Sequence, residues 1–166
     1  MKKIRAVLLT MLAFFCSVNA VFADEISEIK AFFNQYLSAA NTYQANVPDF
    51  YANDARILRY VIQKDGSVYP TPLVIPMDEY KKQMKLNSKI AKLRNYKNNY
   101  NNIQITNQNG DYKLSADRTP STSANDKLKS HFVIGKDASG KYVIKEEMMQ
   151  TREQIFLSQI KKQEKK

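Results

Sequence analysis

The hydrophobic period of the chain changes along its length, and this change constrains the fold more than any other feature of the sequence. In DEISEIKAFFNQYLSAANTYQ, apolar residues such as Ile26, Ile29 and Phe33 recur at helical spacing. In KSHFVIGKDASGKYVIKEE, towards the other end, apolar and polar residues alternate, as they do in β-strands. A long amphipathic helix followed by strands predicts an α+β fold.

The segments between these two stretches predict further helices and an antiparallel sheet. MDEYKKQMKLNSKIAKL has helical spacing, whereas ARILRYVI is rich in large apolar residues and predicts a strand. Asn109 and Gly110 lie between two alternating segments, and an Asn-Gly pair in that position is a strong hairpin signal.

Residues 1–23 have the composition of a secretion signal. A basic start precedes an apolar stretch, and Val21 and Ala23 are the small residues that a signal peptidase reads. We therefore expect cleavage after residue 23, a single domain over 24–151 and a basic C-terminal tail over 152–166. An uncleaved anchor is the alternative for the first segment.

The position of the only cysteine bears on the cellular compartment of the protein. The only cysteine, Cys16, lies within the predicted signal, so the mature domain has no disulfide and must be held together by its core. We expect the periplasm of a Gram-negative bacterium, with secretion as the alternative. No later stretch approaches the roughly 20 apolar residues of a membrane helix, so we do not expect an integral membrane protein.

The chain is strongly basic, with 26 Lys and Arg against 16 Asp and Glu. Residues 1–23 hold three of the basic residues and no acid, so residues 24–166 carry 23 positive against 16 negative side chains, a net charge of +7. One stripe of the second predicted helix holds Lys81, Lys85, Lys89 and Lys92. Such a stripe predicts contact with an anionic envelope surface, or simply a solvated face. Export argues against a nucleic-acid partner.

His131 is the only histidine and therefore bears on any proton-transfer chemistry. Alternation places Ser130 with the apolar residues of its strand and His131 on the opposite face. We expect His131 to face away from the core and Glu146, on the partner strand, to face inward. The alternative for Glu146 is a structural ion pair with Arg56 or Arg59.

Two stretches resemble the nuclear transport factor 2-like superfamily, which includes ketosteroid isomerase and polyketide cyclases. FFNQYLSAANTYQ leading into FYANDARIL is similar to the family's helix and "YADDA"-type segment, and HFVIGKDASGKYVIKEE is similar to its closing hairpin. The resemblance runs from Ile26 to Thr151. It implies a cone fold in which a strongly curved antiparallel sheet wraps the long helix around an apolar pocket, and dimers through the open face of the sheet.

The acids that ketosteroid isomerases use have no counterpart here. Their proton-abstracting aspartate falls at Arg59 or a neighbour, and their carboxylic acid donor falls near Phe132. We therefore assign no catalytic residue and expect no cofactor. One histidine and no cysteine beyond residue 23 also argue against a metal site.

The sequence favours an exported domain that binds an apolar small molecule or an envelope partner protein. Two alternatives remain: an isomerase- or dehydratase-like enzyme with a non-standard acid–base set, and a structural module that forms homodimers or joins an envelope assembly. The polar residues expected to line the pocket are Tyr36, Tyr51, Arg56, Tyr60, Ser130 and Glu146.

Overall fold

The computed structural model describes residues 24–165, so the predicted signal segment lies outside the described residues. The chain divides into two compact units, residues 1–35 and 36–166. A helix covers residues 24–41 and belongs to both units. This helix confirms the prediction from the spacing of its apolar residues.

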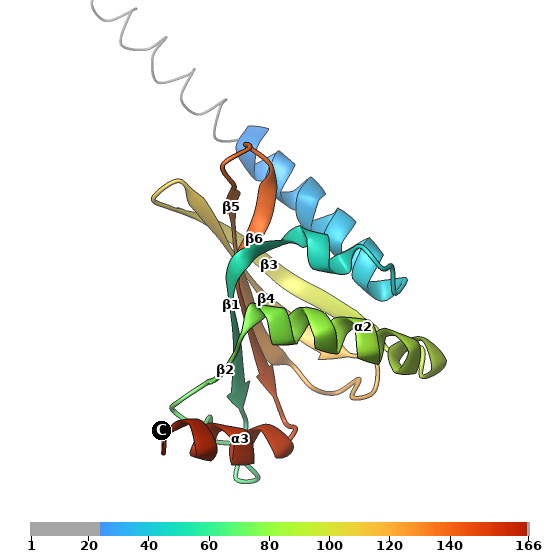
Figure 1. Ribbon diagram of the computed structural model, residues 1–166, viewed down its shortest axis with the longest axis vertical. Helices are drawn as coiled ribbons and strands as arrows, with labels where there is room; N and C mark the ends of the chain where they lie inside the picture. Colours follow the sequence, from blue (N-terminus) through green and yellow to red (C-terminus); the bar gives the residue numbers. More distant parts are fainter. Residues whose placement is uncertain (1–23, 166) are drawn as a thin grey trace, which may run out of the picture. The chain divides into compact units, whose positions relative to one another are not determined.

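The second unit is built on a curved six-stranded sheet with the strand order β2-β1-β6-β5-β4-β3 (Figure 1). Neighbouring strands are antiparallel except β1 and β6, which run parallel. The sheet is therefore mixed, where an antiparallel sheet was predicted. The long connection from β1 to β6 through a helix and other strands permits this parallel pairing. The strands are β1 (Tyr51–Val61), β2 (Leu73–Ile75), β3 (Asn98–Gln108), β4 (Asp111–Pro120), β5 (Leu128–Lys136) and β6 (Tyr142–Thr151).

The hairpin between β3 and β4 turns where the sequence predicted it. Asn109 and Gly110 both have positive φ angles, 55° and 90°, as the tight turns of two-residue hairpins require.

The second unit also contains η1 (Val47–Phe50), α2 (Met77–Leu93) and α3 (Ile155–Gln163). α2 confirms the second predicted helix, and its end is fixed by Asn95 in the left-handed conformation, with φ of 47°. The amides of Asn95 and Tyr96 donate to the carbonyls of Lys92 and Ala91, a pattern that closes helices. The chain then turns directly into β3. No helix within residues 24–165 is long and apolar enough to cross a membrane.

Within the segment predicted to be a basic tail, Ile155–Gln163 form the helix α3. Ile160 of α3 is fully buried. The side chain of Gln163 accepts a hydrogen bond from the amide of Val74 at 3.3 Å and donates one to its carbonyl at 2.8 Å. α3 therefore packs against the edge strand β2.

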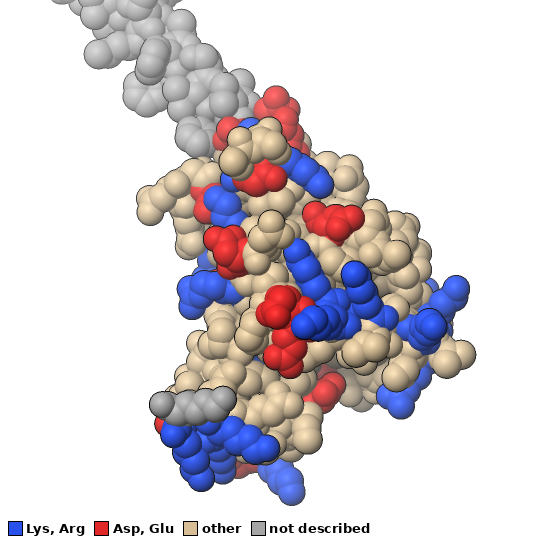
Figure 2. Space-filling model, in the orientation of Figure 1, with Lys and Arg blue, Asp and Glu red and all other residues tan. Residues whose placement is uncertain are grey.

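The lysines of the predicted stripe all lie on α2, and Figure 2 shows basic side chains gathered around α2 and again at α3. Lys85, Lys89 and Lys92 are exposed. Lys81 is half-buried and donates a hydrogen bond to Asn53 at 3.0 Å.

The two faces of the sheet differ in composition. We call inner the face that carries the fully buried Ile57, Leu114 and Phe132, and outer the opposite face. His131 lies on the outer face, between Ser115 of β4 and Met148 of β6. The outward orientation predicted for His131 is confirmed.

A bulge in β6 reverses the orientation predicted for Glu146. Ile144 lies opposite Ile134, but Glu146 lies opposite Val133, so the pairing of β5 and β6 shifts at this point. The extra residue, Lys145, turns Glu147 to the inner face and Glu146 to the outer face. The prediction that Glu146 faces inward is therefore wrong, because side chains alternate between the two faces only where the register of the strands is unbroken.

Candidate functional site

A cavity of about 880 Å³ lies between α2 and the inner face of the sheet. Ligand-binding pockets have volumes of this size. Its apolar lining comes from several elements, including Val47, Ile75, Met84, Ile90, Met149 and Phe156. α2 forms one wall, although Met77 is its only buried residue.

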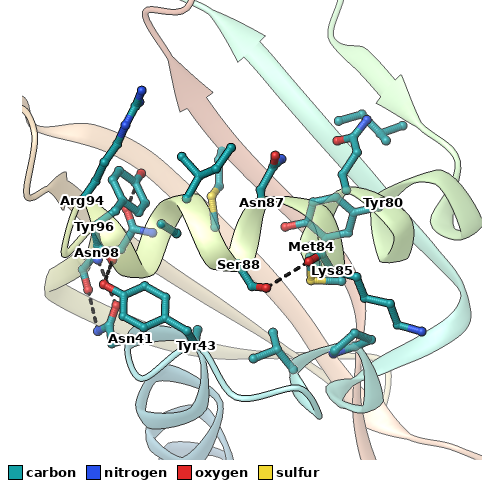
Figure 3. Close-up of a pocket in the computed structure, with 18 of the residues that line it drawn as sticks. Asn41, Tyr43, Tyr80, Met84, Lys85, Asn87, Ser88, Arg94, Tyr96 and Asn98 are labelled. Carbon is teal, nitrogen blue, oxygen red and sulfur yellow. Dashed lines mark hydrogen bonds between the residues drawn. The ribbon is translucent and has the colours of Figure 1, made fainter.

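One side of the cavity is polar. In Figure 3, Asn41, Tyr43, Tyr96 and Asn98 gather at the side away from Tyr80 and Met84. The Asn41 side chain donates to the Asn98 carbonyl at 3.1 Å and accepts from the Asn98 amide at 3.0 Å. The Tyr43 hydroxyl donates to the Tyr96 carbonyl at 2.7 Å. These bonds join the end of the 24–41 helix to the start of β3.

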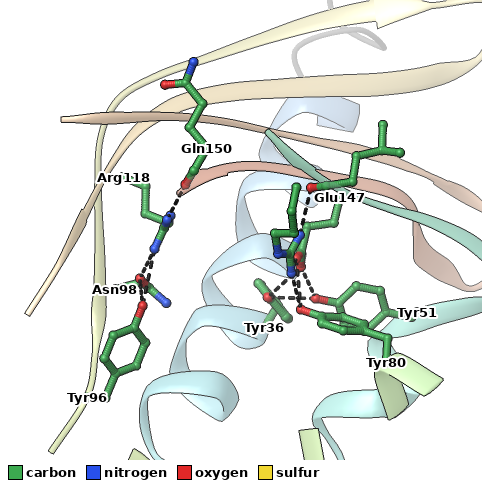
Figure 4. A network of polar contacts seen from close by, with 10 residues as sticks. Tyr36, Tyr51, Tyr80, Tyr96, Asn98, Arg118, Glu147 and Gln150 are labelled. Carbon is green, nitrogen blue, oxygen red and sulfur yellow. Dashed lines mark hydrogen bonds and ion pairs between the residues drawn. The ribbon is translucent and has the colours of Figure 1, made fainter. Parts of the chain in front are cut away.

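Arg118 of β4 also lines this polar side, and Arg118 is only 5% exposed. Its Nη1 donates to the Asn98 Oδ1 at 2.9 Å and the Tyr96 hydroxyl at 3.3 Å, and its Nη2 donates to the Gln150 carbonyl at 2.6 Å (Figure 4). All three acceptors are neutral. The Nε is buried and has no hydrogen-bond partner among the described residues.

A second polar cluster surrounds Glu147, which is fully buried (Figure 4). Its Oε1 accepts from Arg59 at 2.5 Å and from the Tyr80 hydroxyl at 2.9 Å. Its Oε2 accepts from the hydroxyls of Tyr51 and Tyr36. Because an ionised carboxylate offers about four lone-pair sites, the four donors saturate Glu147.

Burial and the Glu147 carboxylate raise the pKa of Tyr36, Tyr51 and Tyr80 above the value of a free tyrosine. Burial alone would lower the pKa of Arg59, but the charge of Glu147 outweighs burial and raises it. The tyrosines therefore stay protonated and donate, and Arg59 stays charged. The cluster is a neutral ion pair held by three hydroxyls, and it presents Tyr36, Arg59 and Tyr80 to the cavity.

The predicted pocket residues are divided among the cavity lining, the buried interior beside it and the outer face of the sheet. Tyr36 lines the cavity, and its hydroxyl lies 2.9 Å from that of Tyr51, which is buried and does not line the cavity. Ser130 is buried and donates to the Ala116 carbonyl at 3.1 Å. Tyr60 alternates with Arg59 along β1 and is half-buried on the outer face.

Arg56 and Glu146 meet on the outer face rather than in the cavity. Their side chains form an ion pair at 2.9 Å, and the other carboxylate oxygen of Glu146 lies 2.8 Å from the His131 Nε2. The structure therefore contains the ion pair that was the alternative to a binding role for Glu146.

The residues predicted from the sequence to line the pocket did not include Arg118 or Glu147, although the sequence carried a signal for Arg118. The alternation of Tyr112, Leu114 and Ala116 continues to Arg118 and places it on the inner face. No such signal exists for Glu147, because the bulge precedes it. Within residues 24–165, no group of three or more His, Cys, Asp and Glu side chains could hold a metal ion.

No protein-family model matches this sequence, and no curated protein matches it. Solved structures do match. One is a nuclear transport factor 2-like protein with a cystatin-like fold from Novosphingobium aromaticivorans, with 6% identity, coverage of 82% of this chain and 88% of that chain, and a TM-score of 0.59. Another is a nuclear transport factor 2-like protein of unknown function from Pseudomonas putida, with 8% identity, coverage of 75% and 84%, and a TM-score of 0.55.

The yeast UBP3-associated protein BRE5 also matches, with 16% identity, coverage of 73% of this chain and 91% of that chain, and a TM-score of 0.52. At such identities the likeness concerns the fold alone. The chain has the α+β nuclear transport factor 2-like fold, which confirms the resemblance identified from the sequence.

Proposed function

We propose that this protein is an exported ligand-binding protein, and that a small, largely apolar molecule occupies the cavity between α2 and the inner face of the sheet. The observation that carries the proposal is the cavity itself. Its volume of about 880 Å³ suits a small molecule, and apolar side chains from several elements surround a few convergent polar groups.

Binding accounts for the site better than catalysis does. A general base needs a lone pair that can take a proton from the substrate, and the lone-pair sites of Glu147 are occupied by Arg59 and three tyrosine hydroxyls. Glu153 is the only carboxylate among the described lining residues, and it is exposed. His131 lies on the outer face.

Native mass spectrometry tests this proposal. The full chain is expressed in a Gram-negative host, purified from the periplasm and weighed under native and denaturing conditions. We expect a native mass that exceeds the denatured mass by that of a small molecule, and a protein that begins at Asp24. Nile red, a neutral apolar dye, should bind the same cavity.

A cavity-filling variant locates the ligand. Ala91→Trp places a large ring in the lining, whereas Ala124→Trp places the same ring in an exposed loop. We expect the first variant to lose both the retained molecule and Nile red, and the second to keep them. A wild-type protein that carries no ligand and binds no Nile red would contradict the proposal.

Contact with an anionic envelope surface is a further part of the proposal. On α2, the exposed lysines Lys85, Lys89 and Lys92 lie beside the exposed apolar side chains of Leu86, Ile90 and Leu93. Helices with this composition bind anionic lipid surfaces. Sedimentation with anionic vesicles, but not with neutral ones, would support this contact, and equal sedimentation with both would contradict it.

A second candidate function is protein association through the sheet, either as a homodimer or with an envelope partner. The observation in its favour is β3, an edge strand whose residues are exposed along most of its length, and unpaired edges readily accept another chain. The fold also occurs in a yeast complex of a deubiquitinase with BRE5. A subunit count of one by native mass spectrometry, with no copurified protein, would argue against this candidate.

A further inference from the structure

Arg118 carries a buried charge that the protein does not neutralise. The residue is 5% exposed and makes no ion pair with any described residue. Burying a charge costs free energy unless an opposite charge and hydrogen bonds compensate for it. A guanidinium has five N–H donors, and three hydrogen bonds to neutral groups occupy only part of them.

The surroundings of Arg118 do not supply the missing negative charge. Lys85 and Arg94, which also line the cavity, add positive charge. Arg59 is already paired with Glu147 at 2.5 Å. Glu153 is exposed and makes no ion pair within the described part of the chain. The cavity lining therefore carries an excess of positive charge.

We propose that the ligand is an apolar molecule with one carboxylate, which pairs with the Arg118 guanidinium at the polar side of the cavity. This inference rests on the proposed function, because it specifies the chemistry of the ligand that the cavity holds. The planar guanidinium recognises carboxylates in preference to neutral acceptors. The apolar part of the ligand then extends along α2 towards Met84 and Tyr80 (Figure 3).

The charge balance favours a carboxylate over a phosphate group. Arg118 offers one uncompensated buried charge, and a carboxylate supplies one negative charge. A phosphate monoester carries a charge between about −1.5 and −2 at neutral pH. Apart from Arg59, which is paired with Glu147, the other basic residues of the described lining are Lys85 and Arg94, and both are exposed. The excess charge of a phosphate would therefore be buried without a buried partner.

Displacement of Nile red tests the inference. At neutral pH, decanoate, decanol and decyl phosphate compete for the wild-type protein. Apolar burial alone would favour decanol, since it carries no charge. We expect decanoate to displace the dye at a concentration roughly tenfold lower than decanol, the gain that a charge-assisted hydrogen bond supplies.

Variants of Arg118 test whether this residue causes the preference for decanoate. Arg118→Gln should abolish the preference for decanoate over decanol, while Arg118→Lys should retain part of the preference. Arg152→Gln is the matched control, because it removes the same charge from an exposed ion pair with Asp126 outside the cavity lining. It should behave like the wild type.

Each contrary result has a distinct meaning. Equal displacement of the dye by decanoate and decanol from the wild type would overturn the inference even if a variant fails to fold, and so would a preference that survives in Arg118→Gln. Tighter binding of decyl phosphate than of decanoate would overturn the assignment to a carboxylate. A wild-type protein that retains no small molecule and binds no Nile red would overturn the proposed function, and this inference with it.

Discussion

Arg59 and Arg118 are both buried arginines on the inner face of one sheet, at 8% and 5% exposure, yet their surroundings differ. Arg59 pairs with the fully buried Glu147 at 2.5 Å and donates to the Tyr80 hydroxyl at 3.0 Å. Arg118 has only neutral acceptors among the described residues. The comparison distinguishes a structural role from a binding role. A buried charge that is paired with an opposite charge is compensated within the core, whereas a buried charge that borders a cavity and has no such partner is suited to bind a charged ligand.

The largest expected effect comes from Glu147→Gln, which leaves Arg59 without its counter-ion and so abolishes the difference between the two arginines. We expect the free energy of unfolding in urea to fall by about 3–5 kcal/mol, because the buried guanidinium loses its partner. The matched double variant, Arg59→Met with Glu147→Leu, should recover much of this loss. A loss below about 1 kcal/mol would show that Glu147 does not compensate Arg59.

The next effect is a loss of stability at alkaline pH. The folded protein raises the pKa of Tyr36, Tyr51 and Tyr80, so unfolded tyrosines release protons first. Their contribution is complete below about pH 10 and declines above it, by at most about 1.4 kcal/mol per pH unit for each tyrosine. Urea denaturation across this range measures the slope. Tyr51→Phe should make it shallower, and an unchanged slope would contradict the assignment.

Arg118→Gln should have a smaller effect on stability than Glu147→Gln. The variant loses hydrogen bonds to three neutral acceptors, but it also removes a charge that has no counter-ion. We expect the free energy of unfolding to fall by no more than about 2 kcal/mol. A loss as large as that of Glu147→Gln in the same urea titration would make Arg118 an architectural residue and weaken the comparison.

The smallest effect belongs to the ion pair of Arg56 with Glu146 on the outer face. The Arg56 side chain is 68% exposed, and exposed pairs contribute at most about 1 kcal/mol. Arg56→Gln should therefore change the free energy of unfolding by less than this amount, and the difference should shrink in high salt. A larger loss would show that the outer face also holds a charge essential to the fold.

The fold could be predicted from the sequence because its signals are local. The helical spacing of Ile26, Ile29 and Phe33, the turn at Asn109 and Gly110, and the alternation around His131 depend on neighbouring residues only. The parallel pairing of β1 with β6 joins distant segments, and no local pattern encodes it.

The site could be predicted only in part. Tyr36 was expected in the pocket and lines the cavity. Glu146 and Glu147 are adjacent carboxylates, so a single bulge at Lys145 decides which one enters the core, and alternation cannot reveal that bulge. Arg118 continued the alternation of buried and half-buried residues along β4. Alternation alone did not identify it as a site residue, because charged residues are rarely buried on the inner face of a sheet.

The most direct test compares the two arginines in one spectrum. The Nε–H signals of Arg59 and Arg118, assigned with Arg59→Met and Arg118→Gln, are followed by ¹H–¹⁵N nuclear magnetic resonance while decanoate is added, with decanol as the control. We expect decanoate to shift the Arg118 signal much more than the Arg59 signal, and decanol to shift neither by a comparable amount. An Arg118 signal that decanoate leaves in place while the cavity is occupied would contradict the claim that Arg118 binds the ligand.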